Sequence, residues 1–209
     1  MTSDPAPSTE AVLDDLLAPP TLDAQRALDA AAAVSSPALL AHSRRSAALA
    51  IDLGRREGLD VDRELLFVAA ALHDVGLAAP FDSHLEPFER AGGEVARVFA
   101  TGAGWSFERR QRLVDVIVRH MWPAVSAGLD VEGHLLERAT SLDVSGVGAD
   151  DWPDDLLAAL VARVPREGFG TEFGALMSGQ AHRKPGSEAA RSIRGGMRAR
   201  ITANPLDRL

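Results

Sequence analysis

Apolar residues recur with a helical period along nearly the whole sequence, and this pattern limits the possible folds more than any other feature. Alternating runs rich in Val, Ile and Thr and joined by Asn-Gly or Asp-Gly turns, which sheet proteins need, are missing. Hydrophobic residues make up 46% of the 209 residues and charged residues 25%, as in a globular chain with one core. We therefore predict an all-α protein with a single domain.

Capping residues, prolines and glycines mark where the expected helices begin and end. Ser36-Pro37 supplies an N-cap and a first-turn proline for a helix that runs to about Glu57. Asp60 or Asp62 caps a strongly apolar helix that ends at His73-Asp74. The other expected helices span Leu22 to Val34, Phe88 to Ala100, Ser106 to His120, Leu135 to Val144, Asp154 to Val164 and Phe173 to Thr202, the last interrupted at Pro185-Gly186. We expect residues 1–21 to form a flexible tail and residues 22–209 to form the domain.

The charge of the chain argues against a nucleic-acid partner. The formal net charge is −8, which would repel a phosphate backbone. Four arginines near the C-terminus have the spacing of a solvated helix face; they are Arg191, Arg194, Arg198 and Arg200. No apolar stretch approaches the roughly 20 residues of a membrane span, and no signal-peptide pattern opens the chain. We expect a cytoplasmic protein that acts on a small molecule, without nucleic acid or membrane as partner, and its apolar helix faces permit a homodimer.

The absence of cysteine from the sequence leaves imidazole and carboxylate groups as the ligands for any metal ion. Lys184 is the one lysine, so the usual candidates for Schiff-base chemistry are also missing. Clusters of His, Asp and Glu are therefore the features to examine.

His73 and Asp74 are adjacent at the end of the most apolar expected helix. Burying an aspartate there is costly unless its charge is neutralised, and a divalent cation neutralises it. His42 and Asp143 lie in two further helices and would complete a site of two imidazoles and two carboxylates. Asp143 also ends its helix, where the helix dipole disfavours a bare carboxylate. We predict one divalent ion held by these four residues, zinc being favoured over iron, manganese and nickel.

His42, the pair His73-Asp74 and Asp143 together resemble the H…HD…D signature of HD-domain proteins. The stretches that resemble the cyanamide hydratase-like branch of this superfamily are 41–46, 72–77, 88–93, 164–169, 184–185 and 204–206. The resemblance covers nearly the whole chain from about Leu22. It implies an HD-domain-like helical bundle with a buried metal site, in which a metal-activated water adds across a nitrile to give a urea.

Two positions depart from other branches of the superfamily. Phosphodiesterases of this type commonly carry HD-x-G-K, whose lysine faces phosphate, whereas the corresponding residue here is Leu77. Binuclear members supply a histidine four residues before a glycine, and the residue four before Gly93 is Glu89. A second metal is therefore less expected, although the Glu89 carboxylate remains able to bind one.

Two residues are the candidates for proton transfer. His120 ends a helix, where the helix dipole favours a histidine for structural reasons, but it is also suited to proton transfer or to orienting the substrate. Glu89 is either a carboxylate in the first turn of its helix or a general base or partner of a ligating histidine. The residues expected more often at the surface or in the core than in a pocket are His84, His134, His182, Phe81, Phe88 and Trp122.

The leading hypothesis is an enzyme in which a metal-activated water hydrates or hydrolyses a small molecule, with cyanamide or nitrile hydration favoured. The first alternative is a nucleotide or phosphate-ester phosphohydrolase, which would need a basic pocket built from arginines such as Arg44, Arg45 or Arg90. A di-iron oxygenase would need more histidines in the middle of the chain, unless His84 or His134 serves. The non-enzyme alternative is a degenerate HD domain for ligand sensing or assembly, which would be expected to have lost a ligand.

Overall fold

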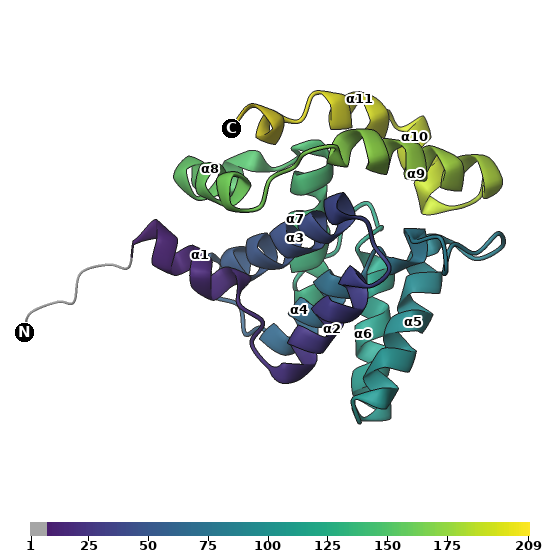
Figure 1. Ribbon diagram of the computed structural model, residues 1–209, viewed down its shortest axis with the longest axis horizontal. Coiled ribbons are helices and arrows are strands. Elements are labelled where there is room, and N and C mark those ends of the chain that lie inside the picture. Colours follow the sequence, from purple (N-terminus) through teal and green to yellow (C-terminus); the bar gives the residue numbers. More distant parts are fainter. Residues whose placement is uncertain (1–7) are drawn as a thin grey trace, which may run out of the picture.

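A computed structural model of the chain describes residues 8–209, and within them every regular element is a helix (Figure 1). The α-helices are α1 (Thr9–Leu17), α2 (Leu22–Ala32), α3 (Pro37–Arg56), α4 (Arg63–Leu72), α5 (Phe88–Gly102), α6 (Phe107–Arg119), α7 (Val131–Ser145), α8 (Asp154–Arg163), α9 (Phe169–Arg183), α10 (Glu188–Arg194) and α11 (Met197–Thr202). Short 3-10 helices are η1 (Val75–Leu77), η2 (Ala149–Asp151) and η3 (Pro205–Arg208). The all-α prediction is confirmed. No helix within residues 8–209 has both the length and the apolar character needed to cross a membrane.

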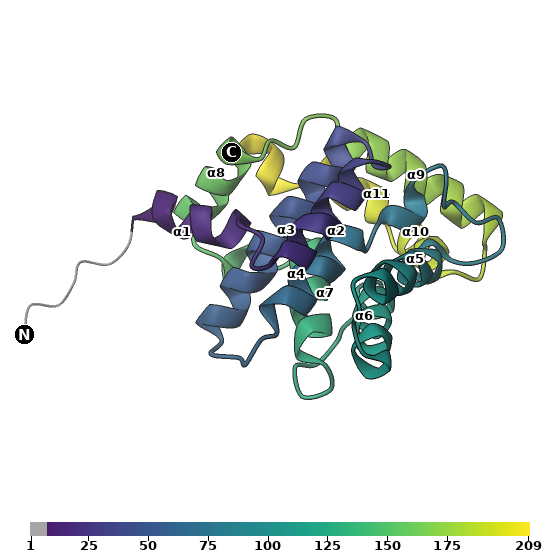
Figure 2. The same ribbon diagram turned by 60° about the horizontal axis from the view of Figure 1, so that its bottom comes forward.

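The centre of the molecule is formed by α3 and α4, which lie against each other, with α7 packed beside both. Every residue from Leu65 to Leu72 in α4 is buried, because this helix has neighbours on several sides: α2, α3, α5, α6 and α7. The hairpin of α5 and α6 lies to one side in both views (Figures 1 and 2). Helices α9, α10 and α11 gather along one edge and contact the central helices through α3 and α7.

The N-terminal segment differs from the expected tail over residues 1–21. Residues 1–7 lie outside the described part of the chain, but α1 begins directly after Ser8, whose side chain accepts a hydrogen bond from the Ala11 backbone N–H. Leu13 and Leu16 are buried in the main core, and α1 packs against α3 and α8. The polar residues at the start of the sequence led to the expectation of a tail. The helix forms nevertheless, because the burial of Leu13 and Leu16, one turn apart, stabilises it.

The end of α4 places two polar residues in the interior. His73 is the C-cap residue, and Asp74 leads directly into η1. Gly76 lets this turn approach α5, since a Cβ atom at this position would lie 2.0 Å from the backbone oxygen of Phe88. This close contact sets the position of His73 and Asp74 relative to α5.

The remaining boundaries agree with the expected helices to within a few residues, with one exception. The C-terminal segment, expected as one or two helices, forms three, and α9 begins at Phe169 rather than Phe173. Its N-cap residue is Gly168 at φ 74°, a backbone conformation that favours glycine.

Candidate metal centre

Three side chains from α3 and the end of α4 converge in the interior. The Nε2 atoms of His42 and His73 lie 3.2 Å apart, and Oδ2 of Asp74 lies 3.2 Å from His73 Nε2 and 3.6 Å from His42 Nε2. Two ligand atoms of one tetrahedral zinc ion lie about 3.4 Å apart, because each is about 2.1 Å from the ion. The group therefore has the dimensions of three corners of a metal coordination shell.

Asp74 is the member of the group that most favours a cation. Both of its carboxylate oxygens are buried and have no hydrogen-bond partner among the described residues. Burial alone would raise the pKa of Asp74, but the neighbouring His73 and His42 outweigh it and hold that pKa at about 2. An ionised carboxylate that is buried without any donor is unfavourable, so the donor set fits a cation.

Both imidazoles are oriented for ligation by the bonds that their other nitrogens make. Nδ1 of His73 donates to the backbone oxygen of Ala70 over 2.8 Å, and Nδ1 of His42 donates to Oδ2 of Asp143 over 2.6 Å. Each Nε2 is therefore the ring atom left to face the group. Burial lowers the pKa of His42, whereas the Asp74 carboxylate, against the effect of burial, raises the pKa of His73. A cation bound here would displace any proton on these nitrogens.

Asp143, predicted as the fourth ligand, is not brought into this group. Its Oδ2 accepts from His42, while Arg45 donates from Nε to Oδ1 over 2.7 Å and from Nη2 to Oδ2 over 2.8 Å. Nη1 of Arg166 donates to Oδ1 over 2.8 Å. Although burial opposes it, the Arg45 guanidinium holds the pKa of Asp143 far below its usual range. With both oxygens occupied, Asp143 contacts the group only through the His42 ring in this structure.

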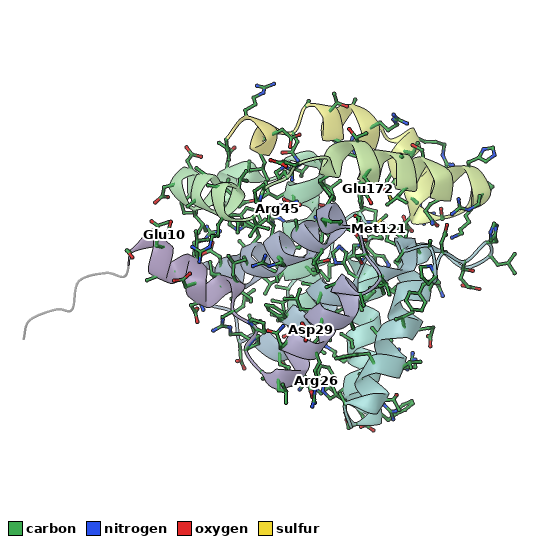
Figure 3. The ribbon with its side chains drawn as sticks, in the orientation of Figure 1. Glu10, Arg26, Asp29, Arg45, Met121 and Glu172 are labelled. Atoms are coloured by element: carbon green, nitrogen blue, oxygen red, sulfur yellow. The ribbon has the colours of Figure 1, made fainter. Side chains whose placement is uncertain are left out.

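The two arginines tie the C-terminal half of the chain to the centre. Arg45 is fully buried and also donates to the backbone oxygens of Val164 and Pro165 (Figure 3). Arg166 donates from Nε to Asp207. Phe169, one turn further along, stacks on the His42 ring at 4.6 Å between centroids. The stretch 164–169, which carried part of the family resemblance, thus packs directly around His42 and Asp143.

His120 lies beside the group at the C-cap of α6. Its Nδ1 donates to the backbone oxygen of Ile117, and its Nε2 lies 4.0 Å from Oδ1 of Asp74. Burial, together with the neighbouring His73, lowers the pKa of His120 to about 3. Because Nδ1 is engaged with the backbone, Nε2 is the ring atom left to face the group.

Glu89, the second candidate for proton transfer, is not brought together with the histidines. It is buried near the start of α5, and burial raises its pKa. Its Oε2 has no hydrogen-bond partner among the described residues, and the charges that act on it are those of Arg90, Lys184 and Arg191. The structure thus provides no contact through which Glu89 would serve a ligating histidine.

A cavity of about 510 Å³ opens above the group. His42, His73, Asp74 and His120 form one part of its lining. The other lining residues include Met121, Trp122, Glu137, Thr140, Ser141, Val144, Phe173, Glu188, Arg191, Met197 and Arg200. Sequence reasoning missed the residues from α7, although the spacing of Glu137, Thr140, Ser141 and Val144 marks one helix face, and polar residues on a buried helix are a usable signal.

The other aromatic and histidine candidates lie in different environments, and only one of them lines the cavity. Trp122 lines the cavity, whereas Phe88 is a core residue and Phe81 is 37% exposed. His134 bonds the backbone oxygen of Val125 and lies near Glu57, which are structural contacts. His84 and His182 are exposed.

Comparison with known proteins agrees with this geometry. Two curated proteins, the cyanamide hydratases DDI2 and DDI3 of Saccharomyces cerevisiae, are each 28% identical to this chain over 131 residues. The matched stretch covers 60% of this chain and 57% of each relative. A family model for the HD domain matches residues 39–144, about half of the chain, and this range contains His42, the pair His73-Asp74, His120 and Asp143. The chain therefore belongs to the HD domain family, and within it resembles the cyanamide hydratases.

Proposed function

We propose that this protein is a metal-dependent hydratase that adds water to a small nitrile-type substrate such as cyanamide. The observation that carries the proposal is the buried, ionised Asp74, whose two oxygens lack any donor while two imidazole Nε2 atoms face it at 3.2 and 3.6 Å. Similarity to proteins named cyanamide hydratase supports the choice of reaction.

His42, His73 and Asp74 would hold the ion, and the same three ligands suit zinc, iron, manganese or nickel. A bound divalent ion supplies a Lewis acid that lowers the pKa of water toward about 7 and polarises the acceptor atom. Three protein ligands leave positions open for water and substrate. Asp143 would act through His42, because its bond to Nδ1 fixes the tautomer and the ring orientation.

His120 would transfer a proton from the attacking water to the substrate. Its Nε2 lies beside Asp74, and the residue lines the cavity, where it would accept a proton from the attacking water as the carbon–oxygen bond forms. The same proton then passes to the nitrile nitrogen, so that water is added and nothing leaves. For cyanamide the resulting imidic acid rearranges to urea.

Phosphate-ester hydrolysis is the less favoured alternative, because none of the three arginines expected to build its basic pocket lines the cavity. Arg45 is buried and bonded to Asp143, and neither Arg44 nor Arg90 lines the cavity. Leu77, at the position of the phosphate-facing lysine of the phosphodiesterases, is buried in an apolar cluster. A neutral reacting group suits this end of the cavity better than a phosphate.

The test is to load the purified protein with zinc, iron, manganese or nickel in turn and to measure urea formation from cyanamide and phosphate release from nucleoside monophosphates. We expect metal-dependent urea formation and a loss of metal binding and activity in Asp74→Asn. Phosphate release without urea formation would favour the phosphohydrolase. Full retention of metal and ligand binding in Asp74→Asn, with no activity in either protein, would favour a sensing or assembly domain.

A further inference from the structure

We propose that the physiological substrate is an amphipathic acid, with its reacting group at the metal centre, an apolar body along the cavity wall, and one anionic group bound by Arg200 beside Arg191. The inference rests on the proposed function, because it takes the end of the cavity near His42, His73 and Asp74 as the reacting end.

The size of the cavity argues for a molecule larger than cyanamide. A volume of about 510 Å³ lies within the range of roughly 300–1,000 Å³ of pockets that enclose drug-sized ligands. Cyanamide, one carbon with two nitrogens, would fill only the part next to the metal centre. The remaining volume needs another occupant, or the site would hold many waters over apolar walls.

Apolar side chains supply part of the cavity lining. Phe173 is buried with its ring centroid 5.8 Å from that of His42, and Met121, Val144 and Met197 also line this space. Trp122 is 38% exposed and also lines the cavity. These side chains favour an aliphatic or aromatic body for part of the ligand.

Two arginines of the C-terminal helices supply cationic groups to the cavity. Arg191 and Arg200, two of the four arginines expected to form a solvated helix face, are exposed as expected and also line the cavity. Arg191 is ion-paired with Glu188, three residues before it. Arg200 donates from Nη1 to the backbone oxygen of Gly195 over 2.7 Å, and within residues 8–209 no salt bridge to a carboxylate involves it. Its remaining N–H groups are available to a carboxylate or phosphate.

Two acidic residues of the cavity already have partners of their own. Glu188 is paired with Arg191. Glu137 is buried, and its Oε1 accepts a hydrogen bond from Ser141. Arg200 thus lines the cavity without a carboxylate partner among residues 8–209, and an anionic group is its complementary ligand.

The experiment compares an ω-cyanoalkanoate with its neutral primary amide of the same chain length. We expect the KM of the acid to be about tenfold lower, since a charge-assisted bond of about 1.4 kcal/mol corresponds to a factor of ten. Arg200→Gln should remove most of this preference, whereas Arg194→Gln, a change in the same segment outside the cavity lining, should retain it. Equal KM values for acid and amide, or an unchanged preference in Arg200→Gln, would overturn the inference.

Binding measured separately distinguishes failure of this inference from failure of the proposed function. If the zinc-loaded protein hydrates neither compound, calorimetric titration still reports whether the acid binds more tightly than the amide and whether Arg200→Gln abolishes the difference. In the wild-type protein, rising ionic strength should weaken binding of the acid and leave that of the amide unchanged. Equal or absent binding of both compounds would reject the amphipathic acid, whatever reaction the metal centre performs.

Discussion

Nδ1 of His42 donates to Oδ2 of Asp143 over 2.6 Å, on the side of the ring opposite the atom that faces His73 and Asp74. In this arrangement the last aspartate of the signature contacts the group of His42, His73 and Asp74 through the His42 ring. Asp143 is in turn held by Arg45 and Arg166, so the orientation of His42 depends on residues from three separate parts of the chain.

The first prediction concerns the metal affinity of Asp143→Asn. Partners of ligating histidines contribute about 10- to 100-fold to metal affinity, so we expect the Kd for zinc to rise by that factor, measured by competition with a chelator. Asp74→Asn should show a much larger loss, because it removes a ligand oxygen. Equal losses in the two variants, with circular dichroism showing both folded, would make Asp143 a ligand after all.

The second prediction separates proton transfer from metal binding at His120. We expect His120→Ala to lower kcat for cyanamide hydration by about 10²- to 10⁴-fold, the usual contribution of a positioned general base. Its zinc content should stay at the wild-type level, because Nε2 of His120 lies outside the group formed by His42, His73 and Asp74. His134→Ala, which changes a histidine in structural contacts away from the cavity, is the control. A parallel loss of zinc in His120→Ala would instead identify His120 as a ligand.

Much of the site could be predicted from the sequence, because its main features are local. The apolar run before His73-Asp74 identifies a buried helix, and a buried aspartate at its end favours a positively charged partner. His42 follows from the signature, and the structure brings it to His73 at 3.2 Å.

The partners of Asp143 could not be predicted, because they depend on contacts between distant segments. Arg45 follows His42 by three residues and so shares its helix face, but nothing local tells whether its guanidinium meets solvent, a phosphate or a carboxylate. Arg166 lies in the connection between α8 and α9, whose path depends on how these helices pack. The cavity wall from α10 and α11 was missed for the same reason, since the arginine spacing there is equally typical of a solvated face.

The third prediction concerns the stability contributed by Arg45. Arg45→Met leaves the Asp143 carboxylate buried with fewer donors, and breaking a buried ion pair on one side costs about 3–5 kcal/mol. We expect the free energy of unfolding in urea, measured on the metal-free protein, to fall by about that amount. Arg44→Met changes the neighbouring arginine, for which the structure gives no salt bridge, and should alter stability by only about 0.5 kcal/mol or less. Similar stabilities for both variants would mean that Arg45 and Asp143 are not paired in solution.

The fourth prediction tests whether Glu89 acts in the reaction or only destabilises the folded protein through burial of its carboxylate. Burial raises its pKa in the folded protein, so folding favours the protonated form. The protonated form of Glu89 therefore contributes to the free energy of unfolding, fully so below its unfolded pKa of about 4.3. This contribution is lost as pH rises through the pKa of the folded protein. Glu89→Gln cannot ionise, and we expect it to be more stable than the wild type at pH 7.

That advantage should shrink as pH falls toward about 3, where Glu89 of the wild-type protein is itself largely protonated in both states. Thermal unfolding of the two proteins at both pH values measures the difference directly. Because no contact links Glu89 to the histidines, the variant should also keep wild-type kcat and zinc content. A loss of kcat together with unchanged stability at pH 7 would restore Glu89 as a general base, and would require its side chain to reach the cavity in the working enzyme.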